Sequence, residues 1–528
     1  MKKKSFVTGA LILILSAILV KLIGAIYRIP LTYILSAEGI GVYQLVYPVF
    51  ALFLVLSSSG VPVSISKLIS KENSKGNFTN SKIIFKYSLK IMLILGLIFS
   101  LIIVVFSGVI SSIQGNSELQ LCYLILAPCI ILGSSISAIR GYFQGFEIMK
   151  YSAISQIIEQ LVKLIFGLFL AYILLPYGLI YGVCGAFLGI LVSEIISVLY
   201  LFLVYKKNIN KINFNENFDT VLTKSEAVKL IISQSLPITL SSIIIPLTSV
   251  VDSLIIVKLL GRVGFNFQLS TSLYGLDSGV VASLINLPSV IAISVGVSLM
   301  PSITSSFAQN NFKEVNLKSK LALKLIWYFT LPCLLVFLLY SKEICYFLYG
   351  SLNSEIYNQL MVASTMLKLS SFSIIYIAFN HILTTILQAL NKSYFAFYTL
   401  LFASVIKVIL TIVLVLNNSI NIYGLVISDV ICYSIASVIN LFKTKQYVNL
   451  NFKFKEIFLV PLLALSTMAI SLVLFKVLLL SSLNRGLILL SLGVSFILYL
   501  VVVILFKGFN IQELSKTKIL KFIKRKKY

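Results

Sequence analysis

The sequence is poor in the residue types on which most enzymes depend. Its 528 residues include one histidine, and charged residues make up 11%, against about 25% in an average soluble domain. A single histidine leaves little room for acid–base or metal chemistry built on imidazole. The sequence contains no Walker loop, no metal-ligand cluster and no acidic pair of a prenyl-phosphate transferase. We therefore expect no enzyme activity, no metal and no other cofactor.

Cysteine and arginine are also scarce. The six cysteines form no C-x-x-C pair, so we expect small apolar side chains rather than disulfides or metal ligands. Only five arginines occur among 43 basic residues. Because a guanidinium binds phosphate in a fork geometry that an ammonium lacks, each arginine inside an apolar stretch is of interest.

Long apolar stretches fill the chain, and 59% of its residues are hydrophobic. A transmembrane helix needs roughly 20 mostly apolar residues. Alternating strands of an outer-membrane barrel are not seen. The sequence predicts an all-α polytopic membrane protein of about fourteen helices, at 6–35, 41–69, 84–110, 119–139, 153–175, 181–205, 230–260, 276–306, 323–341, 359–388, 396–416, 422–442, 457–479 and 487–506.

The basic residues indicate the orientation of these helices. The formal net charge is +26, and lysine gathers in alternate loops and at both termini. The other loops hold only Arg262, Lys342 and Arg485. Since basic loops stay in the cytoplasm, both termini are predicted to be cytoplasmic. The charge therefore reports topology rather than nucleic-acid binding, and the basic tail should contact anionic membrane lipids.

The chain contains an internal repeat. Residues 142–170 resemble residues 386–414, and each copy places a glutamine nineteen residues before a lysine. Two parallel six-helix repeats are typical of transporters whose substrate path lies between the halves. The predicted organisation is an N-lobe (1–205), a cytoplasmic linker (206–229), a C-lobe (230–442), two extra helices (443–506) and a basic cytoplasmic tail (507–528).

Basic residues inside apolar stretches are candidates for a substrate cavity, because charges in mid-membrane are costly. Lys21 and Arg28 are seven residues apart, on one helical face, and Pro30 follows. They would form a cationic wall for an anionic ligand; alternatively, they reach the lipid headgroups. Lys368 in the tenth predicted span lies near the single histidine, His381, for which an interhelical hydrogen bond is the simpler interpretation.

The repeat supplies two more candidate lysines, Lys163 and Lys407. Glu159 lies four residues before Lys163 and can pair with it within the helix. Lys407 occupies the equivalent position without such an acid, which favours a cavity role. Asp252 could bind a coupling ion, balance the cavity lysines, or form a cap or interhelical hydrogen bond. The sequence indicates no role for Glu194 or Asp429.

Two stretches carry a family resemblance. They are VKLIGAIYRIPLTYILSAEGIGVYQLVYPVFALFLVLSSSGVPVSISKLISKE at 20–72 and RGYFQGFEIMKYSAISQIIEQLVKL at 140–164. They resemble the family of stage V sporulation protein B and related polysaccharide exporters. This family lies in the multidrug/oligosaccharidyl-lipid/polysaccharide (MOP) exporter superfamily, which includes the lipid II flippases.

The resemblance implies a flippase in a bacterial plasma membrane. Its substrate would be an undecaprenyl-pyrophosphate-linked saccharide, such as a peptidoglycan, spore-cortex or polysaccharide precursor, moved by alternating access. Arg28 would correspond to the cavity arginine of the first span in lipid II flippases. A second essential arginine of those proteins is replaced here by Tyr47-Pro48.

Other functions stay open at this stage. A cation-coupled multidrug exporter of the same superfamily should have an acidic and aromatic site, whereas the candidate groups here are at least as basic as acidic. A membrane scaffold for sporulation or wall synthesis would leave charges in both repeats unexplained. A membrane glycosyltransferase lacks an acidic catalytic cluster.

Overall fold

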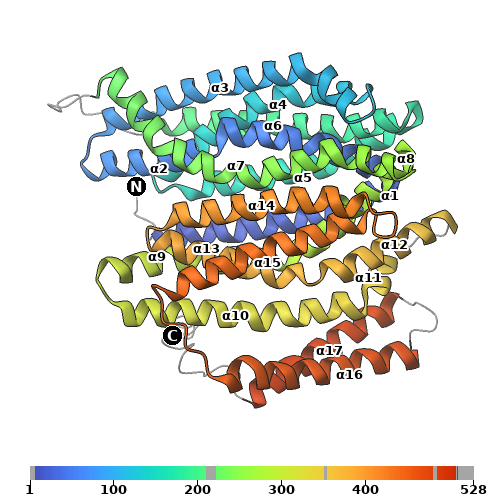
Figure 1. Ribbon diagram of the computed structural model, residues 1–528. Coiled ribbons are helices and arrows are strands. Elements are labelled where there is room, and N and C mark those ends of the chain that lie inside the picture. The colour runs from blue at the N-terminus through green and yellow to red at the C-terminus, as the bar shows by residue number, and fades with distance from the viewer. Residues whose placement is uncertain (1–5, 210–221, 350–353, 480–484, 507, 509–528) are drawn as a thin grey trace. The chain divides into compact units, whose positions relative to one another are not determined.

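The computed structural model describes residues 6–209, 222–349, 354–479, 485–506 and 508, and within these ranges every regular element is a helix (Figure 1). This confirms the predicted all-α fold. The elements are α1 (Phe6–Ser58), α2 (Gly60–Ser74), α3 (Phe78–Ile113), α4 (Leu119–Gly145), α5 (Met149–Leu174), η1 (Leu175–Tyr177), α6 (Leu179–Ile209), α7 (Lys224–Arg262), α8 (Phe267–Tyr274), η2 (Gly275–Val281), α9 (Ala282–Ala308), α10 (Phe312–Leu339), α11 (Ser341–Tyr349), α12 (Ser354–Ser370), α13 (Ser373–Ala389), α14 (Ser393–Val415), α15 (Tyr423–Lys445), η3 (Lys455–Leu459), α16 (Val460–Leu479) and α17 (Arg485–Leu505). The middle of the predicted linker (210–221) and all of the predicted basic tail except Gly508 lie outside the described residues.

The described helices include twelve that are long and apolar enough to cross a membrane, or thirteen if the bent pair α12–α13 forms one span. The predicted fourteen is close to this number. The first of the twelve runs over 60 residues, from Leu15 to Ser74. At 1.5 Å per residue it would measure roughly 90 Å, about three times the thickness of a bilayer core.

A break at Ser36 explains why this element is too long for a single span. Ser36 has φ 62° and ψ 179°, which no helical residue adopts. Lys163 contacts both Tyr27, before the break, and Tyr47, after it. Two residues twenty positions apart on a straight helix would lie about 30 Å from each other. The chain of α1 therefore folds back at Ser36, and this break falls in the gap between the first two predicted spans.

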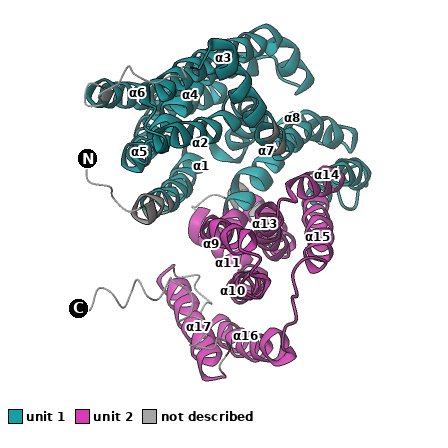
Figure 2. Ribbon diagram, turned by 90° about the vertical axis from the view of Figure 1, so that its left-hand side faces the viewer, with its two compact units in different colours: residues 1–283, 404–425 teal, residues 284–403, 426–528 magenta. Residues whose placement is uncertain are grey.

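Contacts divide the chain into two compact units, coloured separately in Figure 2. Unit 1 comprises residues 1–283 and 404–425, and unit 2 comprises residues 284–403 and 426–528. The predicted lobes rest on a sequence repeat rather than on contacts, so their boundaries stay a prediction.

In unit 1, α3 shows how a membrane helix distributes its residues. Ser88, Gly96 and Ser107 are on its buried side, and α3 runs beside α4 (Figure 1). Val105 and Phe106 are 70% and 51% exposed. Small residues let helix backbones approach closely in a membrane, where lipid solvates the large apolar side chains. The pattern is thus the reverse of that in a water-soluble protein.

Unit 1 also contains a very close contact between α1 and the α8–η2 segment. A Cβ atom on Gly41 would overlap the backbone carbonyl of Thr271, and one on Gly275 would overlap the backbone of Ala37 and Gly41. Only glycine allows this approach, because any side chain would separate the two backbones.

We expect Gly41→Ala to destabilise the protein by about 2 kcal/mol, the usual cost of overpacking a tight contact. Gly261→Ala is the matched control, because a Cβ there meets no atom within 4 Å. Thermal unfolding in detergent measures both variants. Equal melting temperatures for the two would contradict the close contact at Gly41.

In unit 2, polar contacts join α16 and its leading turn η3 to α10. The Lys324 ammonium and the Glu456 carboxylate are 2.7 Å apart, and Lys324 is 1% exposed. The Trp327 indole N–H donates to the Ile457 carbonyl oxygen at 2.9 Å. Hydrogen bonds of this kind hold membrane helices together where lipid cannot replace them. The predicted thirteenth span therefore packs on α10.

Candidate functional site

Five side chains of α1 and α5 form a cation–tyrosine cluster in unit 1. The Arg28 guanidinium carbon lies 5.4 Å from the Tyr43 ring centre. The Lys163 Nζ lies 5.4 Å from the ring centre of Tyr27 and 5.6 Å from that of Tyr47. Cations at these distances are attracted to the electron-rich ring faces. The cluster thus holds two positive charges on aromatic surfaces.

The break in α1 and its helical period build this arrangement. Tyr43 and Tyr47 are four residues apart, so they share a helical face, and their rings stack at 5.5 Å. Tyr43 also stacks on Phe187 of α6 at 4.6 Å. Tyr27 and Tyr43 are 5% and 3% exposed. The Tyr43 ring is therefore packed against two other aromatic rings.

The two cations of the cluster keep their charge available to a ligand. Among the residues that the structure describes, neither Arg28 nor Lys163 forms an ion pair, and the Arg28 Nη1 atom is buried without a hydrogen-bond partner. A ring face attracts a cation without neutralising it. The cluster can thus bind an anion, and a guanidinium suits the paired oxygens of a phosphate.

An ion pair between α4 and α5 adjoins Lys163. Arg140 Nη2 donates to Glu159 Oε2 at 2.8 Å, and Arg140 Nε donates to Ser155 Oγ at 2.8 Å. The predicted pairing of Glu159 with Lys163 within α5 is therefore wrong. The packing of α4 against α5 brings a guanidinium to Glu159, and Lys163 turns to the tyrosines instead. Whether Glu159 has a role in transport stays a prediction.

A second buried ion pair joins α7 and α14, also within unit 1. Lys407 Nζ and Asp252 Oδ2 are 2.7 Å apart, and the two side chains are 9% and 8% exposed. Lys407 has no acid in its own repeat segment, and its acid comes from another helix instead. The predicted role of Lys407 in a substrate cavity stays a prediction. Asp252 balances the charge of Lys407, and its predicted role in coupling stays untested.

The remaining two candidate lysines lie apart from these groups. Lys21 is exposed on α1, while Arg28, seven residues later, is partly buried. Lys368 is exposed on α12 in unit 2. Their predicted roles in substrate binding stay predictions.

Sequence reasoning missed Arg140 and the three tyrosines. Arg140 lies inside α4, five residues before that helix ends at Gly145. The spacing of Tyr43 and Tyr47 is visible in the sequence, but aromatic pairs four residues apart occur in many helices. Only the fold of α1 at Ser36 brings Tyr27 to the same lysine.

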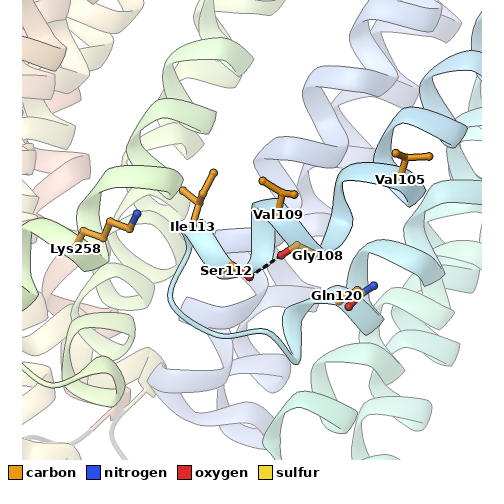
Figure 3. A pocket seen from close by; sticks show the side chains of 7 residues that line it. All are labelled: Val105, Gly108, Val109, Ser112, Ile113, Gln120 and Lys258. Carbon is orange, nitrogen blue, oxygen red and sulfur yellow. Dashed lines mark hydrogen bonds between the residues drawn. The ribbon is translucent and has the colours of Figure 1, made fainter.

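An open pocket of about 600 Å³ lies elsewhere on unit 1 (Figure 3). It lies at the last turns of α3, the first turn of α4 and the Lys258 side chain of α7. Val105 and Val109 supply an exposed apolar surface. The pocket shares no residue with the cation–tyrosine cluster, so the two are separate features.

The sequence profile of the family described as "Polysaccharide biosynthesis protein" matches residues 6–307, more than half of the chain. The chain belongs to this family. Two relatives from Bacillus subtilis (strain 168) are similar over most of their length. Stage V sporulation protein B is 28% identical over 458 residues, 86% of each chain. The lipid II flippase MurJ is 26% identical over 422 residues, 77% of each chain.

Solved structures show the same fold. A lipid II flippase MurJ in an inward closed conformation has a TM-score of 0.69 at 17% identity, covering 93% of this chain and 98% of its own. An inward-facing multidrug resistance MATE family transporter of the MOP superfamily has a TM-score of 0.63 at 16% identity, covering 80% and 97%. These comparisons confirm the predicted family resemblance. They also confirm that the chain is a multi-pass membrane protein, and the named relatives include a flippase and a transporter rather than enzymes.

Proposed function

We propose that the protein is a flippase that moves an undecaprenyl-pyrophosphate-linked saccharide across the bacterial plasma membrane by alternating access. The cation–tyrosine cluster carries the proposal. Arg28 and Lys163 lie on ring faces, and neither is paired with a carboxylate among the described residues. Such a site suits the two phosphates of a headgroup that must leave water on its way across hydrocarbon.

The tyrosines suit the saccharide as well as the cations. Sugar rings present apolar C–H faces and hydroxyl groups, and tyrosine offers both an apolar ring and a hydroxyl. The Tyr27 hydroxyl is buried without a hydrogen-bond partner among the described residues. It is therefore free to bind a hydroxyl of the saccharide or a phosphate oxygen.

The similarity to a flippase of lipid II supports this substrate class. The similarity to stage V sporulation protein B supports a role in sporulation. The alternating basic loops of the sequence support cytoplasmic termini. A cation-coupled drug exporter fits less well, because the cluster attracts anions.

The test is reconstitution of the purified full chain into liposomes. Movement of a fluorescent undecaprenyl-pyrophosphate saccharide to the opposite leaflet is measured by its accessibility to an impermeant quencher. A phospholipid with the same fluorophore and a cationic dye are the comparison substrates. We expect movement of the saccharide lipid alone. Transport of the dye without the saccharide lipid would indicate an exporter, and movement of none would favour a scaffold.

A further inference from the structure

The open pocket at the end of α3 includes an apolar stripe that faces outward. Val105, Val109 and Ile113 line it and are four residues apart, so they lie on one face of α3. Val105 is 70% and Val109 is 56% exposed, and the stripe extends over about 12 Å of helix. Large apolar side chains on the outside of a membrane helix are solvated by lipid. The pocket therefore reaches from the end of α3 into the part of the helix that lipid tails surround.

The other end of the pocket is polar and carries a positive charge. Lys258 is the one charged residue among the seven that line the pocket, and its side chain extends from α7 toward the last turn of α3 (Figure 3). Within the described residues, no carboxylate pairs with Lys258. The Gln120 amide, in the first turn of α4, likewise forms no hydrogen bond with a described residue. The lining thus has an apolar end and a cationic end.

The turn between α3 and α4 is held in place by buried hydrogen bonds. The Tyr123 hydroxyl donates to Gln114 Oε1, and Gln114 Nε2 donates to the Leu45 carbonyl oxygen, both at 2.7 Å. A Cβ atom on Gly115 would lie 3.9 Å from Val257, the residue before Lys258. These contacts fix the end of α3 relative to α4 and α7, so the chain itself forms the pocket. Preformed sites for small molecules measure about 300–1,000 Å³, and this pocket, at about 600 Å³, is within that range.

Gly108 keeps the middle of the pocket open. The atoms nearest to a Cβ on Gly108 would be those of the Gln120 side chain, at 3.7 Å or more, which is an ordinary van der Waals distance. Helix packing therefore does not require glycine here, in contrast to Gly41. A larger side chain at position 108 would fill the pocket instead of separating two helices.

We propose that this pocket binds an anionic phospholipid of the membrane, such as phosphatidylglycerol. Its phosphate contacts the Lys258 ammonium and the Gln120 amide, and one of its acyl chains lies along the apolar stripe of α3. The Ser112 hydroxyl donates to the Gly108 carbonyl oxygen at 2.8 Å, and its oxygen can still accept a hydrogen bond from a headgroup hydroxyl. The site is separate from the cation–tyrosine cluster and from the basic tail, and the inference does not depend on the proposed function.

The test is photolabelling of the purified full chain in detergent. The probe is a phosphatidylglycerol that carries a diazirine in one acyl chain, and mass spectrometry identifies the labelled residues. We expect saturable labelling within residues 105–113. Unlabelled phosphatidylglycerol should suppress it at about a fivefold lower concentration than phosphatidylcholine, the ratio expected for one lysine that faces a lipid with a net negative charge. This measurement on the wild type needs no variant to fold.

Three variants separate the two ends of the pocket. Gly108→Leu should remove the labelling, because the leucine occupies the space of the lipid. Gly493→Leu is the matched control, because Gly493 is an exposed glycine of α17 and a Cβ there meets no atom within 4 Å. Lys258→Met should keep the labelling but lose the fivefold preference for phosphatidylglycerol, and Lys258→Arg should retain the preference.

Several results would overturn the inference. Labelling that does not saturate, or equal competition by the two phospholipids, would mean that lipid only surrounds α3 without a specific site. Unchanged labelling of folded Gly108→Leu, or an unchanged preference in Lys258→Met, would contradict the assigned contacts. Competition by an undecaprenyl-pyrophosphate saccharide but not by phosphatidylglycerol would assign the pocket to the transported lipid instead. Because transport is not measured, none of these results decides whether the protein is a flippase.

Discussion

Replacing Arg28 with alanine is expected to slow the flipping of a lipid-linked saccharide by about a hundredfold, since hydrogen bonds to a charged group contribute roughly 1.5–3 kcal/mol each. The guanidinium lies over the Tyr43 ring and has a buried nitrogen without a partner among the described residues. Arg28→Lys should recover part of the rate, because it restores the charge without the fork. The liposome assay measures each rate.

Lys163→Met tests the second cation of the same cluster. We expect a loss similar to that of Arg28→Ala, and a double variant that loses little more, because two groups on one ligand act as a unit. Arg262→Gln is the matched control, because it removes an exposed guanidinium in the last turn of α7. If Arg28→Ala flipped the lipid-linked saccharide as fast as Arg262→Gln, Arg28 would serve only to reach the headgroups of the membrane lipids.

Replacing Lys407 with methionine is expected to destabilise the folded protein by about 3–5 kcal/mol, because it leaves the Asp252 carboxylate buried without its partner. The two groups are 2.7 Å apart and less than a tenth exposed. Tyr274 and Asp277 lie within electrostatic range of the pair, so the Asp252 carboxylate, no longer balanced by Lys407, would also act on them. The free energy of unfolding is measured by titration with a denaturing detergent.

The double variant Lys407→Met/Asp252→Leu should recover most of this loss, since apolar residues of similar volume often replace a buried ion pair at little cost. Lys75→Met is the control for an exposed ion pair. Lys75 pairs with Glu72 at 3.3 Å and is 58% exposed, so less than about 1 kcal/mol should be lost. If Lys407→Met were as stable as Lys75→Met, the buried pair would not hold α7 to α14.

The helical fold followed from the sequence because it depends on local properties. The length of an apolar stretch decides whether it can span a bilayer, and each of the fourteen predicted stretches overlaps a helix of the structure. The resemblance of residues 20–72 and 140–164 identified the family, which the comparisons confirmed. Arg28 could also be identified as a candidate from the sequence, because an arginine inside an apolar stretch is costly and is usually there for a function.

The partners of the charged residues could be found only in the tertiary structure. Glu159 has a lysine four residues away on its own helix but pairs with Arg140 of α4. Lys407 has no acid in its own repeat segment but pairs with Asp252, 155 residues earlier. A helical period says which residues share a face, whereas the packing of helices decides which faces meet.

The same reason explains the candidate site. The sequence by itself determined that the chain is a membrane protein with a cation in its first span. Both features depend only on the length and the residue types of a single stretch. The break at Ser36 then brought Tyr27 and Tyr47 to one lysine. Charge interactions weaken as the distance between the groups grows, so only the folded chain decided which of these groups act together.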